Sequence, residues 1–184
     1  AGHALATIRS ILPNGLLIGI DQDLDAISHA KKILHPFKDN LRLFHNNFSD
    51  LPKILKSNKI KGVNSILLDL GFSLNQLKNG NRGFSFNKNE PLDMRMDIRN
   101  DLTAFEIINS FQEDELVNIF FKFGEEKFSR RIARRIVEIR KDTPIHTSSK
   151  LAQIVTKAIP AKFVYGRRIH PATRIFQAFR IAVN

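Results

Sequence analysis

Two carboxylates stand at the ends of short apolar runs, where they could bind the hydroxyl groups of a sugar. Asp21 directly follows residues 16–20, and Asp69 lies near the end of residues 65–70. If both runs are strands of a parallel sheet, their carboxyl ends form the edge at which such sheets bind ligands. A carboxylate suits ribose hydroxyls because both of its oxygens accept hydrogen bonds. We therefore predict that Asp21 binds a ribose and that Asp23 caps the next helix, although Asp21 could itself be that cap.

Polar and small residues near these acids could complete a nucleotide-binding site. Ser73 and Gln76 follow Asp69, and they either line the pocket for a base or an amino-acid group or form a plain strand-to-loop turn. Gly2 and His3 open a predicted helix, where a glycine lets backbone N–H groups approach a ligand closely.

Residues 72–99 contain many glycines and asparagines but few periodic apolar positions, which is typical of a functional loop. Aromatic rings and arginine planes in this loop could hold an extruded base by stacking, and Asp93 could accept a hydrogen bond from the amine of that base. Alternatively, the loop is held in place by its own hydrophobic side chains and an Arg–Asp pair. The residues concerned are Arg82, Phe84, Phe86, Asp93, Met94, Arg95 and Met96.

The chain has a formal net charge of +11, and its positive charge is concentrated in the last third. Residues 127–184 contain 14 basic and two acidic residues, whereas residues 100–126 contain one basic and seven acidic ones. Such a surface gains affinity for nucleic acid by releasing counterions from phosphates. Like charges four residues apart disfavour an isolated helix, so phosphates, or acids such as Glu125 and Glu126, would offset the repulsion. We predict RNA contacts for the helix that carries Arg130, Arg131, Arg134 and Arg135; a solvated face of a basic protein is the alternative.

The spacing of apolar residues predicts the elements that must position these groups. Strands at 16–20, 41–44 and 65–70 alternate with helices, which indicates a parallel sheet covered on both faces. Residues 101–160 show helical spacing without a strand, and residues 172–184 form a further helix. Ser49, and either Ser148 or Ser149, are the predicted caps of two of the helices. The sequence therefore predicts an α/β domain with an inserted α-helical subdomain.

Composition excludes several classes of protein and site. The chain has no cysteine, which excludes a disulfide scaffold, a Cys-ligated zinc site and a thiol nucleophile. No apolar run approaches the roughly 18 residues that a membrane helix needs, and the six histidines lack metal-ligand spacing, so we predict no membrane span and no metal site. The chain begins at Ala1 and stops directly after an apolar run, so we expect it to be truncated at both ends.

Several longer motifs, taken together, resemble the RsmH (MraW) methyltransferases over residues 1–184. They are Asp69-Leu-Gly-x-Ser-x-x-Gln76, Arg82-Gly-Phe-Ser-Phe86, Pro91-Leu-Asp-Met-Arg-Met-Asp97, Phe123-Gly-Glu-Glu-Lys-Phe-Ser-Arg-Arg-Ile132 and His170-Pro-Ala-Thr-Arg-x-Phe-Gln-Ala-x-Arg-Ile181. The resemblance implies a cytoplasmic, S-adenosylmethionine-dependent enzyme. Its expected substrate is the exocyclic N4 amine of a cytidine in the decoding centre of small-subunit ribosomal RNA, free or in an assembled subunit. It also implies a Rossmann-like class I methyltransferase domain at residues 1–99 and 170–184, with a helical substrate-recognition subdomain inserted at residues 100–169.

The same resemblance assigns roles to single residues. Ala1, Gly2 and His3 stand where the family has Gly-Gly-His, and Phe48 should lie against the adenine of the cofactor. The implied cofactor-binding residues are Ala1, Gly2, His3, Asp21, Phe48, Asp69 and Gln76. Apart from the resemblance, the candidate RNA-binding residues are Arg82, Arg95, His170 and Arg174, together with the four arginines of the basic helix. Methyl transfer to the cytosine amine needs a group that accepts an amine proton, and Asp93 and the backbone near Asp69 are the candidates.

Two other functions stay open at this point. A nicotinamide-dependent oxidoreductase would use the same kind of sheet, but it would explain neither the basic helix nor the long loop. A non-catalytic RNA-binding module would keep the basic helix and lack a working cofactor site.

Overall fold

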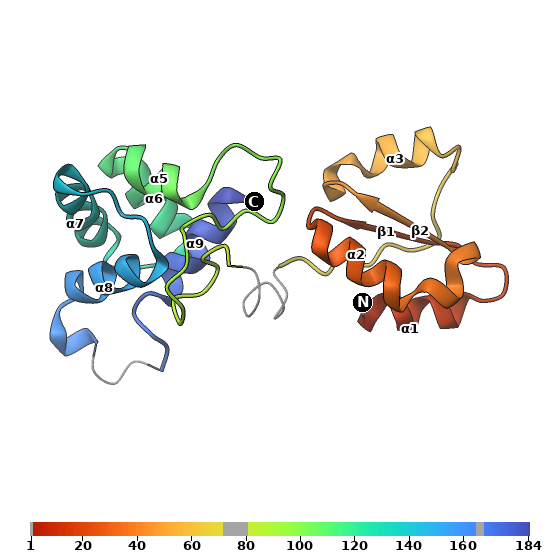
Figure 1. The fold of residues 1–184 in the computed structure, drawn as a ribbon, viewed down its shortest axis with the longest axis horizontal. Helices are drawn as coiled ribbons and strands as arrows, with labels where there is room; N and C mark the ends of the chain where they lie inside the picture. The colour runs from red at the N-terminus through yellow and green to blue at the C-terminus, as the bar shows by residue number, and fades with distance from the viewer. Residues whose placement is uncertain (1, 72–80, 165–167) are drawn as a thin grey trace. The chain divides into compact units, whose positions relative to one another are not determined.

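The computed structural model describes residues 2–71, 81–164 and 168–184 (Figure 1). The chain divides into two compact units, Ala1–Asp69 and Leu70–Asn184, which we call unit 1 and unit 2.

Unit 1 is built on two parallel strands, which pair from Leu17 opposite Leu41 to Asp21 opposite His45. Its elements in chain order are α1 (Gly2–Ile11), β1 (Leu17–Asp21), α2 (Leu24–Ile33), η1 (His35–Asn40), β2 (Leu41–His45), η2 (Phe48–Asp50) and α3 (Leu51–Ser57). Helices α1 and α2 pack against β1. The buried apolar residues of the three helices are Ile8 on α1, Ile27 on α2 and Ile54 on α3. The predicted strands at 16–20 and 41–44 and the helices around them are confirmed, because their patterns report local geometry.

Side-chain caps explain where two helical segments of unit 1 begin. The Asp23 carboxylate accepts a hydrogen bond from the Asp25 backbone N–H at 3.0 Å, so the predicted cap of α2 is confirmed. The predicted cap at Ser49 is wrong: the side chain of Asn47 caps η2 by accepting from the Ser49 N–H at 3.0 Å. Asn47 therefore fixes the chain directly before Phe48.

The prediction of a buried strand at residues 65–70 is also wrong. This segment lies outside every helix and strand of the described residues. Its side chains are exposed, with Ile66 at 59%, Leu67 at 66% and Leu68 at 60% of their full accessible area. A strand needs a neighbouring strand to supply hydrogen-bond partners, and β1 and β2 pair only with each other among the described residues. Residues 65–70 therefore have the composition of a strand, but among the described residues no neighbouring strand pairs with them.

Unit 2 is a helical bundle with a single core. Within the described residues its helices are α5 (Ala104–Ser110), α6 (Glu113–Gly124), α7 (Ser129–Asp142), α8 (Ser148–Ala158), η3 (Ala161–Phe163) and α9 (Thr173–Val183). Helix α6 packs against both α7 and α9, and α7 packs against α8 (Figure 1). The rings of Phe120 and Phe179 meet edge to face with their centroids 5.3 Å apart, and both side chains are fully buried. The predicted helices at 101–160 and 172–184 are confirmed.

Helices α6 and α9 approach closely because a glycine ends α6. A Cβ atom added at Gly124 would lie 2.6 Å from the carbonyl oxygen of Arg174 and 3.2 Å from the Cβ of Ala178. No side chain fits there without movement of the α9 backbone. Gly124 thus sets the distance between the two helices.

The long loop belongs to the core of unit 2. Phe84, Leu92 and Met94 are buried among the helices, and the guanidinium of Arg180 on α9 donates to the carbonyl oxygen of Phe84 at 3.0 Å. The packing therefore differs from the predicted grouping of residues 1–99 with residues 170–184. Both the described part of the loop and α9 share their hydrophobic core with residues 100–164, so the boundary falls before the loop.

A hydroxyl at the start of α8 holds residues 88–90 of this loop by two hydrogen bonds. The hydroxyl of Ser148 donates to the carbonyl oxygen of Lys88 at 2.7 Å and accepts from the N–H of Glu90 at 3.1 Å. Ser148 is fully buried, so its hydroxyl holds the loop, and the helix cap is the preceding residue, Thr147. The predicted cap at Ser148 or Ser149 is therefore displaced by one or two positions.

Candidate functional site

The loops that follow β1 and β2 are bonded to each other at the carboxyl edge of the sheet. The N–H of Asn46 donates to the carbonyl oxygen of Asp21 at 3.0 Å. His45 Nε2 lies 3.1 Å from the carbonyl oxygen of Gln22, and the amide of Asn47 donates to the side-chain oxygen of Gln22 at 3.2 Å. These contacts place Asp21 and the start of η2 at the same edge, as the sequence predicts.

Asp21 keeps an acceptor available at this edge. Its Oδ1 accepts from the N–H of Asp23 at 2.8 Å, and none of the described residues donates a hydrogen bond to its Oδ2. The surrounding chain desolvates the carboxylate and thereby raises the pKa of Asp21, and the negative charge of Asp23 adds to this effect. The hydrogen bond from Asp23 and the charge of His45 partly oppose the increase. A ligand hydroxyl that donates to Oδ2 would stabilise the charged form.

Phe48 and the beginning of α1 supply further candidate contacts in unit 1. Phe48 is 55% exposed, so its ring is available to stack on a base. His3 Nδ1 lies 3.0 Å from Asp69 Oδ2, and both side chains are largely exposed. An exposed pair of this kind contributes little to stability, so the fold does not depend on it. The position of a Cβ at Gly2 has no neighbour within 4 Å among the described residues. Ala1 and Gln76 lie outside the described residues.

In unit 2, Asp93 and Arg95 form a two-point ion pair. Arg95 Nε donates to Asp93 Oδ1 at 2.7 Å, and Nη2 donates to Oδ2 at 2.8 Å. Burial alone would raise the pKa of Asp93, but hydrogen bonds from the Arg95 side chain and backbone outweigh it, aided by the charges of Arg95 and Arg82, and the pKa is lowered. Both oxygens of the candidate proton acceptor thus have partners, which favours the alternative of a loop held by an Arg–Asp pair.

Arg82 is likewise used within the loop. Its Nη1 donates to the carbonyl oxygens of Arg95 at 2.9 Å and Met96 at 3.1 Å, and its guanidinium lies 5.3 Å from the centroid of the Phe84 ring. Phe84 and Met94 have no exposed surface, so the idea that these two side chains hold an extruded base is wrong. The side chain of Asn184 closes the loop, because it accepts from the Met96 N–H at 2.6 Å and donates to the Met94 carbonyl at 2.8 Å.

Phe86 and His170 lie in a different setting. Their rings stack with centroids 4.4 Å apart beside a cavity of about 320 Å³, whose other lining residues are Ser149, Ala152, Gln153, Thr156 and Lys157. His170 Nδ1 accepts from the Ala172 N–H at 3.1 Å, which leaves the ring proton on Nε2. Desolvation lowers the pKa of His170, so the ring is neutral at neutral pH and can donate from Nε2.

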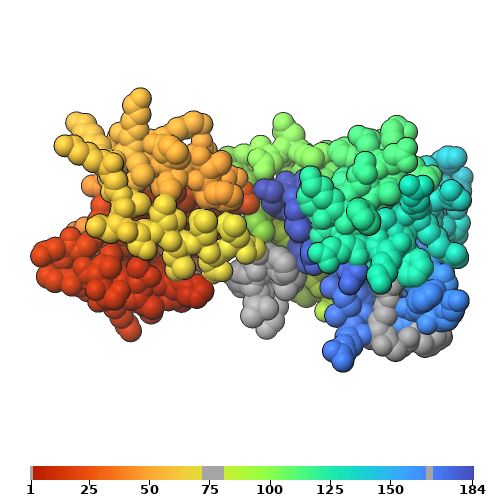
Figure 2. Space-filling view, turned by 180° about the vertical axis from the view of Figure 1, so that it is seen from behind, coloured from red at the N-terminus to blue at the C-terminus, as the bar shows by residue number. Residues whose placement is uncertain are grey.

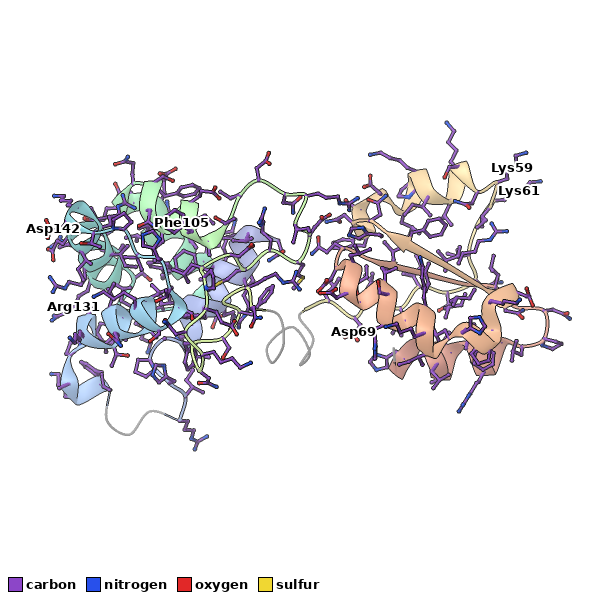
Figure 3. All side chains as sticks on the ribbon, viewed as in Figure 1. Lys59, Lys61, Asp69, Phe105, Arg131 and Asp142 are labelled. Atoms are coloured by element: carbon purple, nitrogen blue, oxygen red, sulfur yellow. The ribbon has the colours of Figure 1, made fainter. Side chains whose placement is uncertain are left out.

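The arginines of the basic helix differ in how much the protein itself uses them. Arg131, which is labelled in Figure 3, donates from Nε to the carbonyl oxygen of Ala158 at the end of α8. Arg134 pairs with Glu113 at 3.7 Å and Arg135 with Glu138 at 3.1 Å, so these acids offset the repulsion expected along the helix. Arg174 Nη1 donates to the carbonyl oxygen of Glu125. Arg130 is exposed and has no hydrogen-bond or ion-pair partner among the described residues.

Unit 2 exposes an aromatic side chain that the sequence motifs do not include. Phe121 on α6 is 70% exposed, beside the fully buried Phe120. Its position breaks the helical spacing of the buried residues, and this departure is the signal that could have identified it. Over the described ranges, no group of three or more His, Asp or Glu side chains is arranged to hold a metal ion. In the same ranges, no helix has the length and apolar character needed to cross a membrane.

An acceptor and an exposed ring at the carboxyl edge of parallel strands are typical of nucleotide-binding α/β proteins. Comparison with known proteins narrows this class. Residues 1–184 match the MraW methylase family. The chain therefore belongs to that family.

Individual relatives agree with this assignment. The ribosomal RNA small subunit methyltransferase H of Desulforapulum autotrophicum is 58% identical over 184 residues, which are all of this chain and 59% of that protein. The protein of the same name from Desulfosudis oleivorans is 52% identical over 183 residues and is covered to 59%. The one from Thermosipho africanus is 46% identical over 183 residues and is covered to 61%. The chain thus spans less than two thirds of the length of these relatives.

Proposed function

We propose that this chain acts in an S-adenosylmethionine-dependent RNA methyltransferase. Its proposed target is the exocyclic N4 amine of a cytidine in the decoding centre of small-subunit ribosomal RNA, in the cytoplasm. The observation that carries the proposal is the carboxyl edge of unit 1, where Asp21 offers an acceptor and Phe48 an exposed ring. The names of the relatives support the RNA substrate, and the basic character of the last third of the chain agrees with it.

The groups at this edge fit an adenosine. Asp21 Oδ2 would accept from the ribose hydroxyls, and Phe48 would lie against the adenine. Gly2, His3 and Asp69 are proposed as further cofactor contacts of unit 1. Ala1 and Gln76 stay candidates from the family resemblance alone, because they lie outside the described residues. When bound, S-adenosylmethionine supplies an electrophilic methyl group. The contribution of the residues of unit 1 is to fix the orientation of the donor, and correct positioning accounts for a large part of the barrier reduction in such transfers.

The cytosine amine is a weak nucleophile because its lone pair is delocalised into the ring. A group that accepts one of the amine protons would localise that lone pair. Asp93 remains the candidate from the sequence, with the backbone near Asp69 as a second candidate. For Asp93 to act, Arg95 would have to release one of its oxygens.

RNA contacts are proposed for the basic residues of unit 2. Arg130 has its donors available, and His170 can donate from Nε2. The other candidate arginines would contact RNA through N–H groups that do not donate to the protein. They are Arg82, Arg95, Arg131, Arg134, Arg135 and Arg174. A guanidinium has five N–H donors, so one protein contact does not exclude a phosphate contact.

The experiment that tests this function uses the full-length protein with methyl-labelled S-adenosylmethionine and unmodified small ribosomal subunits or their RNA. We expect label on the N4 amine of a single cytidine. Asp21→Asn should weaken S-adenosylmethionine binding by about tenfold or more, because the charged acceptor is lost. Asp39→Asn, an exposed acid of the same unit, is the matched control.

The pH dependence of cofactor binding gives a second readout. Because the pKa of Asp21 is raised, its carboxylate forms at a higher pH than that of an ordinary aspartate. Binding of S-adenosylmethionine should therefore strengthen as the pH rises through that pKa, and Asp21→Asn should abolish the dependence. Binding of NADH in place of S-adenosylmethionine would favour the oxidoreductase. RNA binding without cofactor binding or methyl transfer would favour the non-catalytic RNA-binding module.

A further inference from the structure

A groove on unit 2 lies between the middle of α6 and the beginning of α7. It encloses about 470 Å³. In the view of Figure 2 the blue-green atoms of α6 form the front of this unit. The residues that line the groove are Val117, Asn118 and Phe121 on α6, Glu126, Lys127 and Phe128 in the α6–α7 connection, and Ser129, Arg130 and Arg131 on α7.

Phe121 gives the groove an aromatic wall that the fold does not require. It is 70% exposed, whereas Phe120 beside it is fully buried in the core. Exposing a large ring to water is unfavourable by itself. An exposed ring next to cations suits a ligand that has both a flat apolar face and a negative charge.

The charges around Phe121 favour a phosphate. Lys127 and Arg130 are exposed, and the first turn of α7 contains no acidic residue. Glu126 lines the groove but is almost completely buried, and its Oε1 accepts from the N–H of Phe128 at 2.9 Å. Arg131 is held by the carbonyl oxygen of Ala158, so it forms part of the wall. Lys127 and Arg130 are thus the cations of the groove that remain exposed for a ligand.

We propose that this groove binds one nucleotide of single-stranded RNA, with the base stacked on Phe121 and the phosphate bound by Lys127 and Arg130. Base–aromatic stacking works for every base, so the groove would grip the strand without selecting a sequence. The inference rests on the proposed function, because it takes RNA as the substrate. It adds a subsite centred on a residue that neither the sequence motifs nor the basic stripe of α7 includes.

A tryptophan reporter tests the stacking directly. The chain contains no tryptophan, so Phe121→Trp introduces one indole at the site in question. An oligouridine of about ten nucleotides should quench its fluorescence by stacking. Heparin, a polyanion without bases, should bind the basic surface without a comparable quench. Equal effects of the two probes, or saturation with oligouridine without any quench, would refute the stacking.

Binding measurements on substituted proteins test the remaining contacts. Phe121→Ala should weaken oligouridine binding by about tenfold, and Phe121→Trp should restore it. The plot of log K for oligouridine binding against log salt has a negative slope. Lys127→Ala and Arg130→Ala should each make that slope less steep by about 0.7. Lys141→Ala removes the same charge from the last turn of α7 and serves as the control, with an unchanged slope expected. Unchanged affinity in Phe121→Ala overturns the proposal.

The outcomes separate this inference from the proposed function. Methyl transfer by the unaltered protein, together with normal RNA binding by Phe121→Ala, would reject the groove and keep the function. Loss of RNA binding in Phe121→Ala, with no methyl transfer by the unaltered protein, would keep the groove and reject the function. Quenching of the indole that grows with protein concentration in the absence of RNA would show that a second copy covers Phe121, and it would also overturn the proposal.

Discussion

The ion pair of Asp93 and Arg95 allows the sharpest test of how the long loop is held. Replacing Asp93 by Asn keeps the shape of the side chain, removes its charge and turns one acceptor into a donor. Only 22% of the Asp93 side chain and 21% of the Arg95 side chain is accessible to water. A hydrogen bond to a charged group contributes roughly 1.5–3 kcal/mol. Because water can partly replace the lost partner, we expect Asp93→Asn to lower the free energy of unfolding by about 2 kcal/mol.

The pH dependence of this loss follows from the pKa of Asp93. Arg95 holds the pKa in the folded protein below its ordinary value, despite burial. A carboxylate of this kind contributes stability that is fully present above its unfolded pKa of about 3.9. That contribution is lost as the pH falls through the lower pKa of the folded state. The difference between the unaltered protein and Asp93→Asn should therefore be constant near neutral pH and shrink in acid.

Urea unfolding followed by helical circular dichroism, at a series of pH values, measures this difference. Asp101→Asn is a suitable control, because Asp101 is an exposed acid of the adjoining segment. Methyl transfer should be measured on the same proteins. If Asp93→Asn unfolds like the unaltered protein but loses more than about a hundredfold in turnover, then Asp93 is the proton acceptor and our view of the loop is refuted.

Three further substitutions test the packing of unit 2. Asn184→Ala should lower the free energy of unfolding by about 1–2 kcal/mol, because it removes the hydrogen bonds that close the loop; a change within error in urea unfolding would contradict this. Gly124→Ala should destabilise by about 1–3 kcal/mol, because the added methyl meets the α9 backbone, and the thermal midpoint is the measurement. Arg131→Ala should lower stability by about 1 kcal/mol through the lost bond to α8, whereas Arg130→Ala should leave stability unchanged and weaken RNA binding.

The parts of the fold that the sequence predicts are those decided by neighbouring residues. The strand ending at Asp21 and the cap at Asp23 both follow from residues within a few positions of one another. Residues 65–70 have the same apolar character as the first strand, yet they form no ladder, because pairing depends on a partner elsewhere in the chain. Local composition fixes which segments can be strands, and long-range pairing decides which of them are.

The long loop was harder to predict for a similar reason. Phe84 and Met94 show no periodic spacing, and in a loop such side chains can face either a ligand or the core. Their burial depends on α9, which lies about ninety residues later in the chain and bonds the loop through Arg180 and Asn184. The sequence identified the Arg–Asp pair as an alternative but contained nothing that ranked it above a base-binding role.

The hydrogen-bond capacity that remains after folding now ranks the candidate residues. In the sequence, nothing distinguishes Arg82 and Arg95 from Arg130 as candidates for RNA binding. In the structure, Arg82 already donates to loop carbonyl oxygens and Arg95 to the carboxylate of Asp93. Asp21 has one oxygen that no described residue bonds, and desolvation of its carboxylate disfavours the charged form and raises the pKa. Phe121 is exposed although the core lies one residue away. Groups whose exposure or charge the fold opposes are the ones that a ligand would satisfy, so cofactor and RNA should depend on them more than on the motif residues that hold the loop.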